Sequence, residues 1–62
     1  MTKLTLHKNG ASVTFERNPV NGFYTVAVYS PSFTLYDRVR CDTYRTAVEY
    51  RKTFNAIAKN YF

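Results

Sequence analysis

Cysteine, tryptophan, histidine, glycine and proline are all scarce in this chain. Its 62 residues include one cysteine, one histidine, two glycines, two prolines and no tryptophan. A single cysteine excludes an intramolecular disulfide, and a secreted domain of this size usually needs several such cross-links. We therefore expect the protein in a reducing compartment, the cytoplasm, or the host cytoplasm if the chain is viral.

Long apolar runs and acidic residues are also lacking. No stretch approaches the roughly 18 apolar residues of a membrane span, and the first residues lack the apolar core of a signal peptide. We expect a soluble protein with no membrane partner. Nine lysines and arginines against four acids give a formal net charge of +5, which favours nucleic acid or an acidic protein as partner. Such a charge also keeps a small domain soluble, and that simpler explanation stays open.

The residue types that catalytic and metal sites need are scattered. His7 stands alone, and no cysteine or histidine pair has the spacing of zinc ligands. Cys41 precedes a predicted helix whose positive end could lower a thiol pKa, but a lone cysteine at such a junction is more often a small buried apolar residue. The phosphate-binding glycine motifs are missing. We expect a protein that is not an enzyme and binds no cofactor or metal.

What the chain does have is alternation. In residues 3–7 and 12–16 polar and apolar side chains alternate, and the intervening Asn9-Gly10 supplies the left-handed dihedral angles of a tight hairpin turn. These two runs predict a hairpin. The apolar set, which we expect on the core side of the sheet, is Leu4, Leu6, Val13 and Phe15.

A second hairpin is predicted further along the chain. Residues 23–29 and 33–40 are rich in β-branched and aromatic residues and flank the turn Ser30-Pro31-Ser32. Asp37 interrupts the second run, which indicates either a bulge or a sheet edge. Alternation predicts an inward set of Tyr24, Val26, Val28, Phe33, Leu35 and Val39, and an outward set of Phe23, Thr25, Ala27, Tyr29, Thr34, Tyr36, Arg38 and Arg40.

The last third of the chain predicts one amphipathic helix from Asp42 to Tyr61. Asp42 is a good N-cap, because its carboxylate can accept hydrogen bonds from the unpaired amides of the first turn. At about 100° per residue the apolar side chains fall on one stripe and the charged ones opposite. That apolar stripe consists of Ala47, Tyr50, Phe54, Ile57, Ala58 and Tyr61.

Residues 1–62 are therefore expected to form a single α+β domain, an antiparallel four-stranded sheet of two hairpins followed by one C-terminal helix on one face (ββββα). A helix is about 10 Å across, whereas four strands about 4.8 Å apart make a sheet nearly twice as wide. One sheet face is left bare, and the other is expected to leave an apolar edge near Leu4 or Tyr24. Either surface could bind a partner or a second copy, so a homodimer stays open.

The bare face is the predicted binding surface. Its rings can stack on unpaired bases and its cations can contact phosphates. Arg38 and Arg40 alternate along one strand, about 7 Å apart, which is close to the spacing of successive phosphates. Packing of the rings across strands and an ordinary solvated edge would explain the same residues. The predicted site consists of Lys3, Phe23, Tyr29, Tyr36, Arg38 and Arg40.

The stretch from Phe23 to Asn60, with FYTVAVYS, a short turn, FTLYDRVRCDTYRTAVEY and a closing helix, resembles the small sheet-plus-helix DNA-binding domains of phage-type integrases. In that family a three-stranded sheet enters the major groove and a C-terminal helix braces it, which implies that Tyr36, Arg38 and Arg40 face the groove. This chain departs from the family in its additional N-terminal strand and its uncharged turn, Ser30-Pro31-Ser32.

The short length and the VRCDTYRTA segment also resemble the accessory proteins of bacterial viruses, many of which bind and block a host protein. Two functions are therefore expected as alternatives. One is nucleic-acid binding, with DNA ahead of RNA, which predicts a steep salt dependence. The other is a virus- or mobile-element-encoded inhibitor of an acidic bacterial protein, which predicts aromatic hot spots and weak affinity for nucleic acid.

Overall fold

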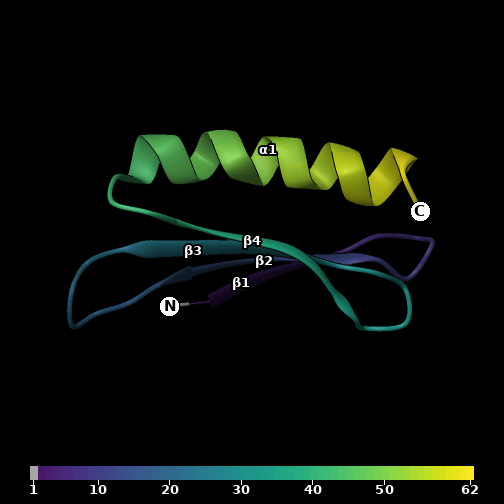
Figure 1. Cartoon of the computed structure of the whole chain (residues 1–62), viewed down its shortest axis with the longest axis horizontal. Coiled ribbons are helices and arrows are strands. Elements are labelled where there is room, and N and C mark those ends of the chain that lie inside the picture. The colour runs from purple at the N-terminus through teal and green to yellow at the C-terminus, as the bar shows by residue number, and fades with distance from the viewer. Residues whose placement is uncertain (1) are drawn as a thin grey trace.

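The structure, a computed structural model, describes residues 2–62. Within these residues the chain forms an antiparallel sheet of four strands followed by one helix (Figure 1). The strands lie side by side in chain order, so each neighbouring pair is connected by a loop at one end of the sheet. The expected ββββα architecture is confirmed. The elements are β1 (Thr2–Leu6), β2 (Ser12–Arg17), β3 (Tyr24–Tyr29), β4 (Leu35–Cys41) and α1 (Tyr44–Asn60).

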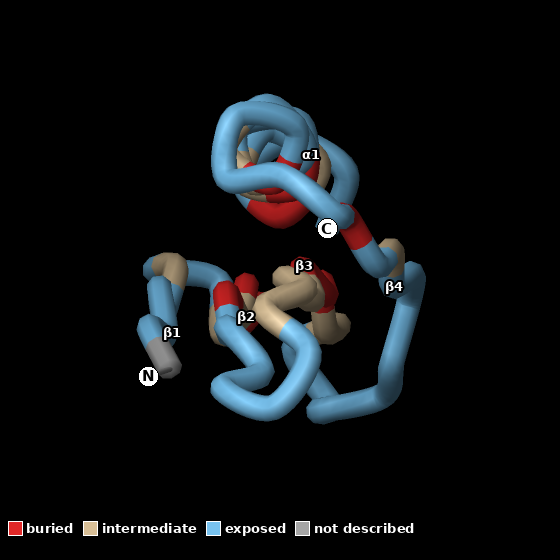
Figure 2. The backbone as a smooth tube through the Cα atoms, turned by 90° about the vertical axis from the view of Figure 1, so that its left-hand side faces the viewer, coloured by how far each residue is buried: buried red, intermediate tan, exposed pale blue. Residues whose placement is uncertain are grey.

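Helix α1 lies along one face of the sheet, above β2, β3 and β4 (Figures 1 and 2). Strand β1 lies to one side, beyond the width of the helix (Figure 2). We call the side under the helix the covered face and the other side the bare face. In the described part of the chain no helix packs on the bare face. Among residues 2–62 there is also no helix with the length and apolar character to cross a membrane.

The core lies between α1 and the covered face, where the buried backbone segments gather (Figure 2). Small alanines on the helix allow it to approach the sheet closely. The predicted apolar stripe is confirmed in part, because Tyr50 and Tyr61 are 40% and 66% exposed and lie at its margin. The central buried side chains are Val13, Val26 and Val28 from the sheet and Ala47, Phe54 and Ala58 from the helix.

The N-cap of α1 is Thr43 and not Asp42, and the helix begins at Tyr44. Thr43 has extended backbone angles, φ −127° and ψ 151°, and its hydroxyl oxygen accepts a hydrogen bond from the Thr46 amide at 3.2 Å. Threonine and aspartate are both good caps, so side-chain chemistry alone does not choose between neighbouring positions. The extended backbone of Thr43, at the corner between β4 and α1, makes Thr43 the N-cap residue.

The predicted orientation of β1 is wrong. Leu4 and Leu6 lie on the bare face, where they are 64% and 65% exposed. In the observed register Lys3 pairs with Phe15, and directly paired residues point to the same face of a sheet. Because Phe15 is part of the core, Lys3 lies on the covered face. The sequence had predicted Lys3 on the bare face.

The loop between β1 and β2 explains this reversal. The His7 amide donates to the Ala11 carbonyl at 2.8 Å, the Gly10 amide donates to the His7 carbonyl at 3.0 Å, and Gly10 has a left-handed φ of 94°. This is a three-residue loop, residues 8–10, in which a type I turn is followed by a left-handed residue. A two-residue Asn-Gly turn would instead put Leu4 opposite Phe15. One additional residue moves every side chain of β1 to the other face.

The loop between β3 and β4 has the same hydrogen-bond pattern. The Ser30 amide donates to the Thr34 carbonyl at 2.9 Å, and the Phe33 amide donates to the Ser30 carbonyl at 2.8 Å. Phe33 therefore occupies the position that Gly10 has in the first loop, with φ 63°. It was predicted to face inward in a strand, but it lies in this loop and is 76% exposed. The two loops touch, since a Cβ on Gly10 would lie 3.3 Å from the Pro31 Cβ.

A bulge at the start of β4 makes the predicted orientations of Leu35 and Tyr36 wrong. Tyr29 pairs with Leu35 while Val28 pairs with Asp37, so Tyr36 is the additional residue. Both explanations for Asp37 are therefore confirmed, because the bulge is present and β4 is an edge strand of the sheet. Leu35, predicted inward, shares the bare face with Tyr29 and is 46% exposed. Tyr36, predicted for the bare face, turns toward the C-terminal end of α1.

Candidate nucleic-acid interface

The bare face changes character along its strands. One cross-strand row, at the end of the β1–β2 and β3–β4 loops, is mostly apolar, and we call this the apolar end. The opposite end, beside the loop between β2 and β3, carries arginines, and we call this the basic end. From the apolar to the basic end, the rows are Leu6, Ser12, Tyr29 and Leu35, then Leu4, Thr14, Ala27 and Arg38, then Glu16, Thr25 and Arg40.

A shallow hollow of about 400 Å³ lies at the basic end. Inside it the guanidinium carbon of Arg40 lies 5.3 Å from the centroid of the Phe23 ring, within cation–π range. Both arginines are exposed, and they project from alternate positions of β4. The residues that line the hollow are Asn18, Asn21, Phe23, Thr25, Arg38 and Arg40.

The loop between β2 and β3 fixes the position of Phe23. The Asn18 amide donates to the Phe23 carbonyl at 2.8 Å, and the Gly22 amide donates to the Asn18 carbonyl at 2.8 Å. The Asn21 Oδ1 atom accepts from the Phe23 amide at 2.9 Å. Gly22 takes a left-handed φ of 75°, which glycine adopts without steric cost. The ring that meets Arg40 is thus held by a loop with its own hydrogen bonds.

Three of the six predicted site residues converge at this hollow: Phe23, Arg38 and Arg40. Tyr29 also lies on the bare face, but in the row of the apolar end, half-buried between Ser12 and Leu35. The polar part of the hollow was not among the predicted site residues and consists of Asn18, Asn21 and Thr25. Two asparagines in a six-residue loop between predicted strands were the available signal.

Lys3 and Tyr36 were predicted for the bare face, and this placement is wrong, because Lys3 lies on the covered face and Tyr36 packs against residues 61 and 62. The Tyr36 ring packs against Tyr61 and Phe62, with centroids 5.2 and 5.3 Å away. A hydrogen bond to Tyr61, with a further contribution from desolvation, raises the pKa of the Tyr36 phenol above its ordinary value. Tyr36 therefore joins the sheet to the end of the chain. The physical reason is the bulge, which reverses the alternation at this residue.

Cys41 ends β4 within the core cluster and is 4% exposed. Burial raises the pKa of its thiol, and the nearby Asp42 carboxylate adds to that effect. A thiol with a raised pKa carries little of the nucleophilic thiolate at neutral pH. The small buried apolar interpretation of this cysteine is favoured over the reactive one. Among residues 2–62 no three His, Cys, Asp or Glu side chains lie together where they could hold a metal ion.

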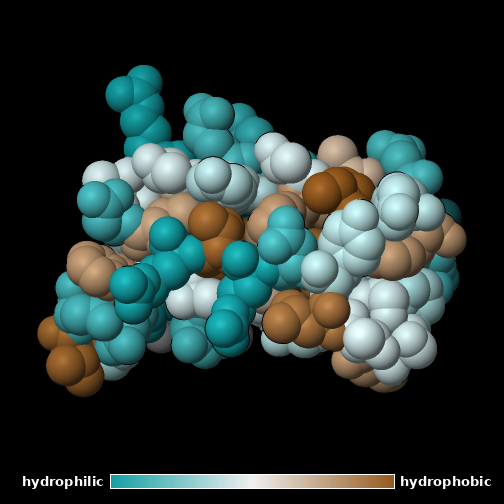
Figure 3. All heavy atoms as spheres, in the orientation of Figure 1, coloured by the Kyte–Doolittle hydropathy of each residue, from teal (hydrophilic) through white to brown (hydrophobic). Residues whose placement is uncertain are grey.

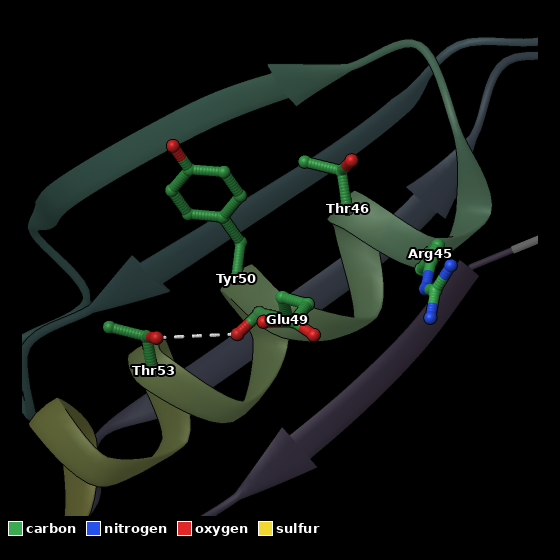
Figure 4. A pocket seen from close by; sticks show the side chains of 5 residues that line it. All are labelled: Arg45, Thr46, Glu49, Tyr50 and Thr53. Atoms are coloured by element: carbon green, nitrogen blue, oxygen red, sulfur yellow. Dashed lines mark hydrogen bonds between the residues drawn. The ribbon is translucent and has the colours of Figure 1, made fainter.

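A further hollow, of about 430 Å³, follows the exposed side of α1 (Figure 4). Its lining comes from the helix alone: Arg45, Thr46, Glu49, Tyr50 and Thr53. In Figure 4 the Arg45 side chain points away from Tyr50, and the Thr53 hydroxyl donates to the Glu49 carbonyl oxygen at 3.3 Å. Side chains from one helix do not converge on a ligand, so this hollow is a surface trough.

The exposed hydrophobic side chains are distributed over several elements. Viewed from the side of β4, hydrophobic residues reach the surface in separate places between hydrophilic ones (Figure 3). The most exposed large ones are Val20, in the loop beside the basic end, and Phe33. This side of the molecule therefore carries no single continuous hydrophobic area of the kind that marks an obligate interface.

Comparisons of the chain with protein-family models, with curated proteins and with solved structures found no match. The chemistry of the chain's own surface therefore carries the functional argument.

Proposed function

We propose that this chain is a non-enzymatic nucleic-acid-binding domain that acts in the cytoplasm and binds DNA ahead of RNA. The basic end of the bare face is the binding surface. The observation that supports it best is the placement of Arg40 over the Phe23 ring, with Arg38 in the same hollow. The formal net charge of +5 supports it further, because a positive field draws polyanions to the surface.

The arginines, the aromatic ring and the asparagines of the hollow have different tasks in this proposal. Arg38 and Arg40 are two residues apart on β4, about 7 Å, so they can hold neighbouring phosphates of one strand. Phe23 offers a ring to a base or sugar. The guanidinium held over that ring presents its own planar face, on which a base can also stack. The Asn18 and Asn21 side chains add polar contacts at the rim.

Fluorescence anisotropy of labelled duplex DNA, single-stranded DNA and RNA at two or more salt concentrations tests this proposal. The variant Arg38→Ala/Arg40→Ala is compared with Lys52→Ala/Lys59→Ala, which also removes two positive charges, from exposed positions on α1. Loss of two phosphate contacts reduces the slope of log affinity against log salt by roughly 1.4–1.8 and weakens binding by about 10-fold or more. Equal losses in both variants would contradict the site, because net charge alone would then account for binding.

Phe33 and the apolar end favour a second candidate function, the inhibition of an acidic bacterial protein. Phe33 is 76% exposed in the loop next to the apolar end, where Leu6 of β1 and Leu35 of β4 are also exposed. Aromatic rings are enriched at protein interfaces, and apolar side chains exposed together mark interaction sites. Under this function none of the three nucleic acids binds, and Phe33→Ala abolishes capture of the partner. The same end could instead join two copies of the chain, which sedimentation would detect.

A further inference from the structure

Three aromatic rings meet at the start of α1, on the covered face. The centroids of Phe15 and Tyr24 are 5.7 Å apart, those of Phe15 and Tyr44 are 6.0 Å apart, and those of Tyr24 and Tyr44 are 5.7 Å apart. The planes are tilted or edge to face, which is the preferred geometry of aromatic pairs. Phe15 is 7% exposed whereas Tyr44 is 58% exposed. The cluster is therefore closed at its base and open at its mouth.

Three cations surround these rings. Lys3, Arg17 and Arg51 line the same pocket, whose volume is about 130 Å³. The guanidinium carbon of Arg51 lies 5.2 Å from the Phe15 centroid, so its side chain is held in place by the ring. All six of the described residues that line the pocket are aromatic or cationic, and no carboxylate of the described chain is among them. The positive charge of this pocket is thus concentrated.

The sheet register brings these groups together. Lys3 is the cross-strand partner of Phe15, and Arg17 follows Phe15 by two positions on the same face of β2. The lining residues come from β1, β2, β3 and α1. Figure 2 shows that the helix does not extend over β1. The pocket faces away from the basic end, on the other side of the sheet, so it does not depend on the function proposed for that surface.

We propose that this pocket binds the phosphate monoester group of a nucleotide. A phosphate monoester carries a charge of about −1.5 to −2 at neutral pH, which is larger than the single negative charge of a backbone phosphodiester, and it offers three acceptor oxygens. Two arginine forks and a lysine match that charge and those acceptors. The exposed face of Tyr44 at the mouth can receive the attached base by stacking.

The size of the pocket agrees with a small group. Sites for whole drug-sized ligands are usually about 300–1,000 Å³, whereas this pocket is about 130 Å³. The phosphate enters it and the rest of the ligand stays outside. The monoester has two possible sources, a free mononucleotide and the 5′-terminal phosphate of a nucleic-acid strand.

Titrations followed by NMR shifts of the Phe15, Tyr24 and Tyr44 rings test the proposal. The probes are adenosine 5′-monophosphate, adenosine, and one short oligonucleotide carrying either a 5′-phosphate or a 5′-hydroxyl. The monophosphate is expected to shift all three rings and adenosine none. A free nucleotide as source predicts equal shifts with both oligonucleotides, and a strand terminus predicts stronger binding of the 5′-phosphate form. If neither the monophosphate nor the 5′-phosphate oligonucleotide shifts the rings, the proposal is overturned.

Variants separate this pocket from general charge effects. Lys3→Ala/Arg17→Ala removes two exposed cations and is expected to weaken binding of the monophosphate by about 10-fold or more. Lys52→Ala/Lys59→Ala, with the same loss of charge, and Arg38→Ala/Arg40→Ala are expected to change it by less than about twofold. Equal losses in all three variants would overturn the proposal. Should the first variant unfold, Arg51→Lys keeps the charge but removes the guanidinium fork, and unchanged binding there would also count against the pocket.

Discussion

Asn9, in the first hairpin loop, donates a hydrogen bond from Nδ2 to the Ala58 carbonyl of helix α1 at 2.8 Å, across 49 positions of the chain. Its Oδ1 atom accepts from the Ala11 amide at 2.9 Å, which holds the loop in its three-residue form. A further hydrogen bond between this loop region and the helix joins the His7 Nε2 atom and the Asn55 Oδ1 atom at 2.8 Å. The loop that sets the register of β1 is therefore attached to the last turns of the helix.

Replacing Asn9 by Ala is expected to lower the free energy of unfolding by about 1–3 kcal/mol, because two part-buried hydrogen bonds are lost. Urea unfolding followed by circular dichroism measures it. The matched control is Asn18→Ala, where the Oδ1 atom accepts from the Val20 amide in an exposed loop, and a loss below about 1 kcal/mol is expected. Equal losses of stability in the two variants would show that the hydrogen bond from Asn9 to Ala58 does not stabilise the fold.

The register of β1 can be tested by its leucines. Leu6→Ser is expected to change the free energy of unfolding by less than about 0.5 kcal/mol, because the side chain is exposed on the bare face. Val26→Ala, at a fully buried position, is expected to cost about 2 kcal/mol through lost burial and the cavity that remains. The same urea titration measures both. A large loss for Leu6→Ser would restore the register expected from alternation alone.

The left-handed backbone conformation of Phe33 is predicted to lower the free energy of unfolding. A left-handed conformation costs an L-residue roughly 1–2 kcal/mol, so Phe33→Gly is expected to raise the free energy of unfolding by about 0.5–1 kcal/mol after the entropy of glycine is subtracted. Thermal unfolding measures the gain. Phe33→Ala serves as control, since it removes the same ring and keeps the strained φ. A gain of similar size in the alanine variant would place the cost in the ring and not in the backbone.

Tyr36→Ala is expected to separate stability from binding. Loss of its contacts with Tyr61 and Phe62 should lower the free energy of unfolding by about 1–2 kcal/mol. Its affinity for DNA, measured by anisotropy well below the unfolding temperature, should stay within about twofold of the parent protein. A loss of affinity as large as that of Arg38→Ala/Arg40→Ala would return Tyr36 to the binding surface.

Cys41 gives a prediction that depends on pH. Its folded-state pKa is raised, so the native thiol should react with iodoacetamide more slowly than a free cysteine and reach its full rate only at higher pH. The protonated thiol therefore contributes fully to the free energy of unfolding below the unfolded-state pKa of about 8.5, and this contribution is lost as the pH rises through the folded-state pKa. Labelling rates from pH 7 to 10, with and without urea, measure it. Equal rates in both conditions would contradict the burial of Cys41.

The sequence predicts the order and type of all five described elements, because alternation and helical periodicity are local properties. The orientation of β1 and of Tyr36 could not be obtained in this way. Each depends on a single residue, one in a loop and one in a bulge, and hydrophobicity does not encode either. Lys3 and the leucines beside it exchange faces as a result.

For the candidate site, too, the sequence predicts the residues that follow regular alternation and not the others. Arg38 and Arg40 follow the β4 bulge in regular alternation, so the sequence predicts their shared face. The pocket around Phe15 was missed because Lys3 was placed on the other face and because Arg51 had no assigned place. Arg51 lies three residues before Phe54 on α1, beside the buried stripe, and that spacing was the available signal.

The contact of Gly10 with Pro31 makes the two hairpin loops one structural unit. Insertion of one residue in either loop would lengthen a three-residue turn, disturb its contact with the neighbouring loop and reverse the faces of the strand that follows or precedes it. The loop that contains Val20, at the opposite end of the sheet, meets no such neighbour among the contacts described, and Val20 itself is 92% exposed. A fluorophore attached to the side chain at position 20 would therefore displace no second hairpin loop.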